Sequence, residues 1–162
     1  MDSPFDFREG APCRQALAID GGGKPGLDHC YCLDKEGLKV ACSLIDRENG
    51  RKLEVLTTMP GIQIYMGNWI DGEFPHLQHN GVALECQHYP DSPNHPDFPS
   101  TTLLPGEVYE GTIVFRFMLA LIVWLKETLI TQKTDRMERC RCVISSCLII
   151  AYKVLALEMN IG

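Results

Sequence analysis

Short runs in which apolar and polar residues alternate, each ended by turn-forming residues, fill the chain from Phe5 to Phe117. Successive side chains of a strand point to opposite faces, so a period of two is typical of a strand with one buried face. Leu38–Ile45 is followed by turn residues at Asp46–Gly50 and by an extended run at Leu53–Met59, which predicts a hairpin. We therefore expect an all-β unit over residues 1–117.

A second alternating run, Ile62–Met66, follows the break at Pro60–Gly61. Its three apolar residues are expected on one face, opposite Gln63 and Tyr65. Prolines then recur between Pro90 and Pro105, which predicts an extended loop outside the β ladder, because proline lacks the N–H that a ladder needs. A closing strand is expected where alternation resumes, at Tyr109–Phe117.

The pattern changes after Phe117. Met118–Leu125 is almost wholly apolar, Lys126–Arg141 is charged, and Cys142–Leu157 is apolar again, without glycine or proline. This pattern favours two helices joined by a polar segment. Neither apolar run reaches the roughly 20 uncharged residues that span a bilayer. We expect residues 118–162 to form a helical tail, packed or poorly ordered, with membrane or protein contact through it as the less favoured alternative.

Charge and cysteine content narrow the function classes. The formal net charge is −6, which argues against a nucleic-acid partner because phosphate binding depends on clustered Lys and Arg. The first residues lack the apolar core of a secretory signal, so we expect a cytoplasmic protein whose eight cysteines are reduced thiols. A zinc site built from His29, Cys30, Cys32 and Cys42 lacks the usual ligand spacing, and no metal is expected.

One carboxylate, Glu85, lies in an alternating strand that leads into a polar, proline-broken loop. In a strand from Val82 to Tyr89, Glu85 and Gln87 share one face, and Leu84 and Cys86 lie on the other. One face can then pack while the other meets a polar ligand. On spacing alone, the favoured interpretation of Glu85 is an ordinary solvated strand residue.

Many short motifs from residue 4 to residue 117 occur in the order typical of one family. The chain resembles the aldose 1-epimerases, also called galactose mutarotases, in the segments Pro4–Arg8, Leu27–His29, Leu53–Thr58, Pro60–Gln63, Gly67–Asn68, Asp71–Gly72, Gly81–Gln87, Pro90–Asp91, Asn94–His95, Phe98–Pro99 and Leu104–Glu107. The resemblance implies that these residues are the C-terminal portion of an antiparallel β-supersandwich about twice the length of this whole chain, followed by an unrelated tail.

The resemblance also implies a site. Glu85 occupies the place of the family's active-site carboxylate and corresponds to the general base. Asp28 matches a family residue that accepts hydrogen bonds from sugar hydroxyls, and Gln63 matches a binding-site glutamine. The implied reaction interconverts the α and β anomers of a hexose such as galactose or glucose by acid and base catalysis, and needs no metal or cofactor.

In family proteins the acid and a second essential histidine precede the Asp-Phe-Arg motif, and this sequence starts three residues before Pro4. We therefore expect a chain that keeps the base of an isomerase but lacks the acid segment, with impaired catalysis. The candidates for a substitute acid are His79, His88 and His95. The alternatives are a non-catalytic sugar-binding protein and a protein that interacts through its tail.

Overall fold

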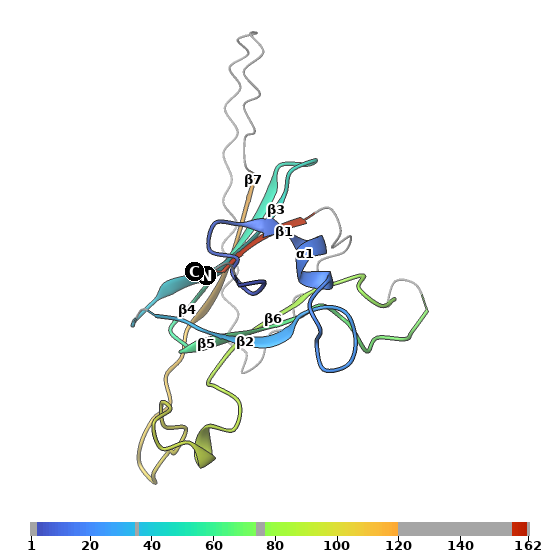
Figure 1. Cartoon of the computed structure of the whole chain (residues 1–162). Coiled ribbons are helices and arrows are strands. Elements are labelled where there is room, and N and C mark those ends of the chain that lie inside the picture. The colour runs from blue at the N-terminus through green and yellow to red at the C-terminus, as the bar shows by residue number, and fades with distance from the viewer. Residues whose placement is uncertain (1–2, 35, 74–76, 120–156, 162) are drawn as a thin grey trace, which may run out of the picture.

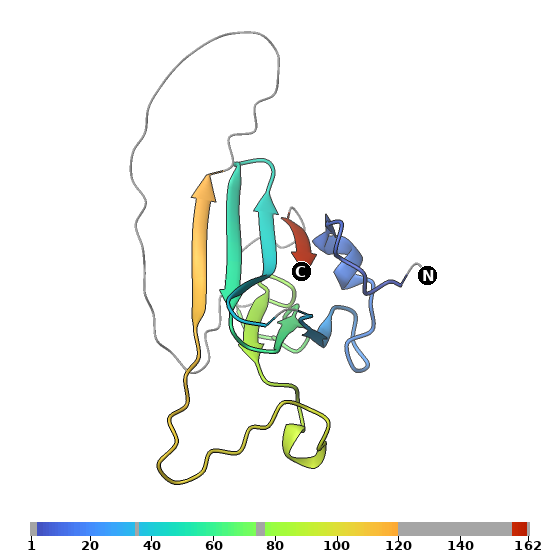
Figure 2. The same cartoon turned by 90° about the vertical axis from the view of Figure 1, so that its left-hand side faces the viewer.

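The computed structural model describes residues 3–34, 36–73, 77–119 and 157–161. The described strands form two antiparallel sheets, one of five strands in the order β1-β8-β3-β4-β7 and one of three in the order β2-β5-β6 (Figures 1 and 2). The strands are β1 (Ala11–Pro12), β2 (Asp28–Cys32), β3 (Lys39–Asp46), β4 (Arg51–Thr57), β5 (Gly61–Tyr65), β6 (Ala83–Gln87), β7 (Ile113–Leu119) and β8 (Leu157–Ile161). The prediction of a mostly β, antiparallel unit is confirmed.

Both sheets contribute to one buried apolar cluster. Ile62, Ile64 and Leu84 enter it from the three-stranded sheet, and Leu44 and Val55 enter it from the five-stranded sheet. Each of these side chains is at most 3% exposed. Both sheets therefore bury apolar side chains in one shared cluster.

The predicted hairpin is confirmed as β3 and β4. The carboxylate of Asp46 accepts hydrogen bonds from the backbone N–H groups of Glu48 and Asn49 in the turn. It also forms an ion pair with Arg51, whose Nη2 lies 2.7 Å from Asp46 Oδ2. Side-chain hydrogen bonds from Asn49 and then from Arg51 lower the pKa of Asp46 from 3.8 to about 2. This end of the hairpin is therefore held by charge as well as by the ladder.

Strict alternation along Leu38–Ile45 would place Leu38, Val40, Cys42 and Leu44 on one face, and the structure interrupts that face. Cys42 and Leu44 are buried, whereas Leu38 is 54% exposed and Val40 is 43% exposed. The register with β4 shifts between Val40 and Cys42, as at a β-bulge, so Ala41 and Cys42 are both buried. A bulge adds one residue to a strand and reverses the alternation beyond it.

The described end of the predicted helical tail is a strand. β8 lies between β1 and β3 and buries Met159 and Ile161 in the core. The alternation of Leu157, Met159 and Ile161 with polar neighbours explains this, because a period of two suits a half-buried strand. β7 also continues to Leu119, beyond the expected boundary at 117. The rest of the predicted tail, residues 120–156, lies outside the described residues.

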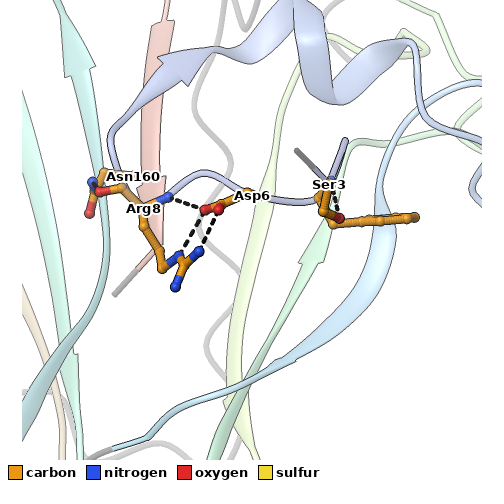
Figure 3. A network of polar contacts seen from close by, with 5 residues as sticks. Ser3, Asp6, Arg8 and Asn160 are labelled. Carbon is orange, nitrogen blue, oxygen red and sulfur yellow. Dashed lines mark hydrogen bonds and ion pairs between the residues drawn. The ribbon is translucent and has the colours of Figure 1, made fainter. Parts of the chain in front are cut away.

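Residues near the N-terminus contact β8. Asn160 Nδ2 donates a hydrogen bond to the carbonyl of Arg8, and Ile161 N–H donates to the carbonyl of Phe7 at 3.3 Å. Arg8 in turn pairs with Asp6, with Nη2 at 2.6 Å from Oδ2 (Figure 3). The Arg8 side chain lowers the pKa of Asp6 to about 2. The first and last described segments thus meet at the β1–β8 end of the five-stranded sheet.

The structure contains little helix. The sequence pattern did not predict α1 (Cys13–Leu17), a single turn that buries Cys13 and Ala16. A 3₁₀ turn, Ser92–Asn94, lies in the proline-rich loop, which projects from one end of the sheets in both views (Figures 1 and 2). That loop carries no ladder strand, as predicted. Among the described residues, no helix has the length and apolar character needed to span a membrane.

Candidate functional site

The three-stranded sheet has one apolar face and one polar face. Ile62, Ile64 and Leu84 are at most 1% exposed on the core side. On the polar face, Gln63 of the central strand β5 is the cross-strand neighbour of Glu85 in β6. Gln63 also pairs with Cys30 in β2, on the other edge of β5. The predicted separation of apolar and polar side chains in these strands is therefore confirmed.

An open hollow of about 460 Å³ lies over this polar face. Its volume is in the range of small-molecule sites, roughly 300–1,000 Å³. The structure brings all three predicted site residues to the hollow. The lining residues are Asp28, Gln63, Tyr65, Trp69, Glu85, Gln87 and Pro90.

Gln63 is held by Asp28. Its Nε2 donates a hydrogen bond to Asp28 Oδ1 at 2.7 Å. No described group forms a hydrogen bond or ion pair with the carboxylate of Glu85, which is partly exposed. Both oxygens of Glu85 and the second oxygen of Asp28 are therefore available to a ligand.

Tyr65 and Gln87 could be placed at the site from sequence, because they lie two residues from Gln63 and from Glu85 on the same faces. Trp69 could not, since it belongs to the irregular segment after β5. Its backbone N–H donates to the hydroxyl of Tyr65 at 2.9 Å, and Lys24 Nζ lies 4.1 Å from the centroid of its ring. The aromatic side chain of Trp69 thus borders a face that is otherwise polar.

A buried asparagine ties the segment of Trp69 to the start of β2. Asn68 Nδ2 donates to the carbonyl of Gly26 at 2.8 Å, two residues before Asp28. Gly26 has φ +115°, and a Cβ at this position would lie 2.1 Å from Asn68 Oδ1. Only glycine therefore fits here, and the contact keeps two lining residues, Asp28 and Trp69, on neighbouring segments.

None of the described histidines lines the hollow. His79 Nδ1 lies 3.0 Å from the carbonyl oxygen of Met66, and because a carbonyl can only accept, Nδ1–H is the donor of this hydrogen bond. His88 lies beside the ring of Tyr109, and His95 lies 3.3 Å from Asp91 Oδ2 in the projecting loop. These three candidates for the acid therefore lie outside the lining of the hollow in this structure.

Two thiols lie near the hollow. Cys30 and Cys32 point to the same face of β2, and burial raises the pKa of Cys30, while a hydrogen bond with Gln87 partly offsets this. Cys42, which was considered with them as a zinc ligand, lies in the core beside β4 instead. Within the described ranges, no group of three His, Cys, Asp or Glu side chains is arranged to hold a metal ion.

Comparison with known proteins identifies the family. The family model of aldose 1-epimerase matches residues 1–116. Galactose mutarotase of Mus musculus is 42% identical over 123 residues, covering 72% of this chain and 35% of the relative. Galactose mutarotase of Homo sapiens is 41% identical over 123 residues, which again cover 72% of this chain and 35% of the relative. Aldose 1-epimerase of Escherichia coli is 34% identical over 125 residues, covering 70% of this chain and 36% of the relative.

The chain spans about a third of the length of these curated relatives. The matched residues nevertheless include β2, β5 and β6, and with them every residue that lines the hollow. By sequence match over most of its length, the chain belongs to the aldose 1-epimerase family.

Proposed function

We propose that the hollow binds the pyranose form of a hexose and that Glu85 is the general base that interconverts its α and β anomers. The observation that carries this proposal is the shared polar face, on which Gln63 lies opposite Glu85 and hydrogen-bonds Asp28. Carboxylate and amide groups suit sugars, which present many directional hydroxyl donors and acceptors. Family membership supports the reaction class.

In the proposed reaction, Glu85 takes the proton of the C1 hydroxyl while an acid protonates the ring oxygen. The C1–O5 bond breaks and leaves an aldehyde, and rotation about the C1–C2 bond turns its other face toward the C5 hydroxyl. On reclosure the C5 oxygen attacks C1, the C5 hydroxyl gives its proton back to the conjugate base of the acid, and Glu85 gives its proton to the oxygen on C1. Each proton transfer by a positioned group contributes about 10²- to 10⁴-fold.

Asp28 and Gln63 are proposed to bind substrate hydroxyls. Their mutual hydrogen bond fixes one donor of the Gln63 amide and leaves its Oε1 free to accept from a sugar. From the order of the motifs between Pro4 and Glu107, we further infer that the matched segment corresponds to the C-terminal portion of the family fold.

Hexose binding without turnover is a second candidate function. The observation that favours it is the placement of the histidines, since His79, His88 and His95 are all absent from the residues that line the hollow. A site that has the base but no positioned acid holds a sugar more readily than it opens the ring.

Polarimetry of freshly dissolved α-D-glucose and α-D-galactose tests the proposal. We expect the chain to accelerate the approach to anomeric equilibrium and Glu85→Gln to lower that acceleration by about 10²- to 10⁴-fold with an unchanged circular dichroism spectrum. Glu110→Gln, a carboxylate change in the exposed loop, is the matched control and should keep the rate.

Two results decide between the candidates. Binding of either sugar without acceleration would favour the non-catalytic function. An active chain that keeps its rate after Glu85→Gln would show that Glu85 is not the base.

A further inference from the structure

The hollow presents negative charge without a matching cation. Its two ionisable carboxylates, Asp28 and Glu85, form no ion pair with any described residue. The other lining side chains, from Gln63, Tyr65, Trp69, Gln87 and Pro90, include no lysine, arginine or histidine. A ligand that enters the hollow therefore meets two acidic groups on one sheet face.

The amide of Gln63 adds to this character. One of its two donors is used by Asp28 Oδ1 at 2.7 Å, which orients the amide and leaves Oε1 as an acceptor. The hollow therefore presents a set of hydrogen-bond acceptors, namely Gln63 Oε1, the second oxygen of Asp28 and both oxygens of Glu85. Such a set binds hydrogen-bond donors, and binds charged donors most strongly.

One cation, Lys24, contacts a residue that lines the hollow. Its Nζ lies 4.1 Å from the centroid of the Trp69 ring, and Lys24 is not among the lining residues. The face of an aromatic ring attracts a cation, which helps to hold the Lys24 ammonium over Trp69. Among the described residues that line the hollow, the two carboxylates are the charged groups, so the lining itself is negative.

We propose that this site selects hexoses by charge, with Asp28 and Glu85 favouring a protonated amino hexose over the neutral hexose and disfavouring a hexose phosphate. The inference rests on the proposed binding of a hexose in the hollow. Because the hollow is open to solvent, the charge interactions are weakened by water, and the expected preference for the amino sugar is about 1.5- to 5-fold in Kd. A phosphate should weaken binding by at least a similar factor.

Titration of the purified chain with D-glucosamine, D-glucose and D-glucose 6-phosphate, followed by NMR at low salt, tests this order. We expect Kd to increase from glucosamine to glucose to glucose 6-phosphate. Added salt should bring the three values closer together, because ions screen exposed charges. At a pH high enough to deprotonate the amine, glucosamine should bind like glucose.

Matched variants separate the local charge from the net charge of the whole chain. Asp28→Asn should reduce the preference for glucosamine over glucose, whereas Asp97→Asn, the same change in the exposed loop, should leave it unchanged. Equal Kd values for glucose and glucosamine, tighter binding of the phosphate, or equal effects of the two variants would overturn the charge selection alone. Absence of binding by all three sugars would overturn the proposed function as well.

Discussion

The two sheets differ in how their charged side chains are partnered. On β4 of the five-stranded sheet, Glu54 is paired with Lys52 Nζ at 2.7 Å and with Arg116 Nη1 at 3.0 Å. Hydrogen bonding by Lys52 is the largest cause of the lowered pKa of Glu54. On the three-stranded sheet, neither Asp28 nor Glu85 has a cationic partner among the described residues.

The difference distinguishes a supporting sheet from a binding sheet. Paired charges on a solvent-exposed sheet face satisfy each other and have no need of a ligand. Carboxylates that line a hollow and have no ion-pair partner can accept hydrogen bonds from a bound ligand. We therefore interpret the five-stranded sheet as the scaffold and the outer face of the three-stranded sheet as the candidate site.

The largest expected effect is a difference in stability between substitutions on the two faces of β6. Leu84→Ala should lower the free energy of unfolding by about 2–5 kcal/mol, because Leu84 is 1% exposed in the shared core. Glu85→Gln, the neighbouring change on the polar face, should alter it by less than about 0.5 kcal/mol. Chemical denaturation measures both. Equal destabilisation by the two changes would break the distinction between a core face and a ligand face.

A smaller effect is expected where the site depends on backbone geometry. Gly26→Ala should destabilise the chain by about 1–3 kcal/mol and weaken sugar binding, because φ is +115° and the new Cβ would meet Asn68 Oδ1. Gly22→Ala is the control, since Gly22 has φ +81° but no atom within 4 Å of the added Cβ. Denaturation midpoints and sugar titrations should both show a larger loss for Gly26→Ala. Identical losses would mean that the contact with Asn68 does not position the site.

The scaffold should also lose stability in acid. The pKa of Asp46 is lowered from 3.8 to about 2 in the folded chain, so its stabilising effect is present above pH 3.8 and is lost as pH falls toward about 2. Asp46→Asn should therefore lower stability at neutral pH and reduce the slope of stability against pH in this window. Denaturant titrations at a series of pH values measure both. An unchanged slope would contradict the role given to the Asn49 and Arg51 hydrogen bonds.

The smallest effect is expected for an exposed pair. Arg116→Gln removes one partner of Glu54 but leaves Lys52 in place, and should cost about 0–1 kcal/mol. Added salt should reduce the difference in the free energy of unfolding between the variant and the unmodified chain, because ions screen exposed charges. Denaturation at low and high salt checks this. A loss of several kcal/mol, insensitive to salt, would show that Arg116 is more than a surface partner.

The parts of the fold that depend on local pattern could be predicted from sequence. Alternation placed Ile62 and Ile64 on the other face of their strand from Gln63, and placed Leu84 on the other face from Glu85, because a strand with one buried face has a period of two. The family motifs then selected Asp28, which the pairing of β2 with β5 brings to the same face.

The remaining features depend on contacts between distant segments. The bulge near Ala41 shows only when β3 is paired with β4. β8 is a strand because it fits between β1 and β3, whereas the long apolar run before it favours a helix by pattern alone. Trp69 reaches the hollow through an irregular segment that Asn68 fixes to Gly26, a contact with no periodic signal.

An NMR titration with D-galactose shows whether the outer face of the three-stranded sheet is the binding surface. We expect chemical-shift changes at the Gln63 side-chain amide, the Trp69 indole and the backbone of Glu85, with no changes along β3 and β4. Saturable shifts confined to the five-stranded sheet, or no shifts from a folded chain, would contradict this expectation.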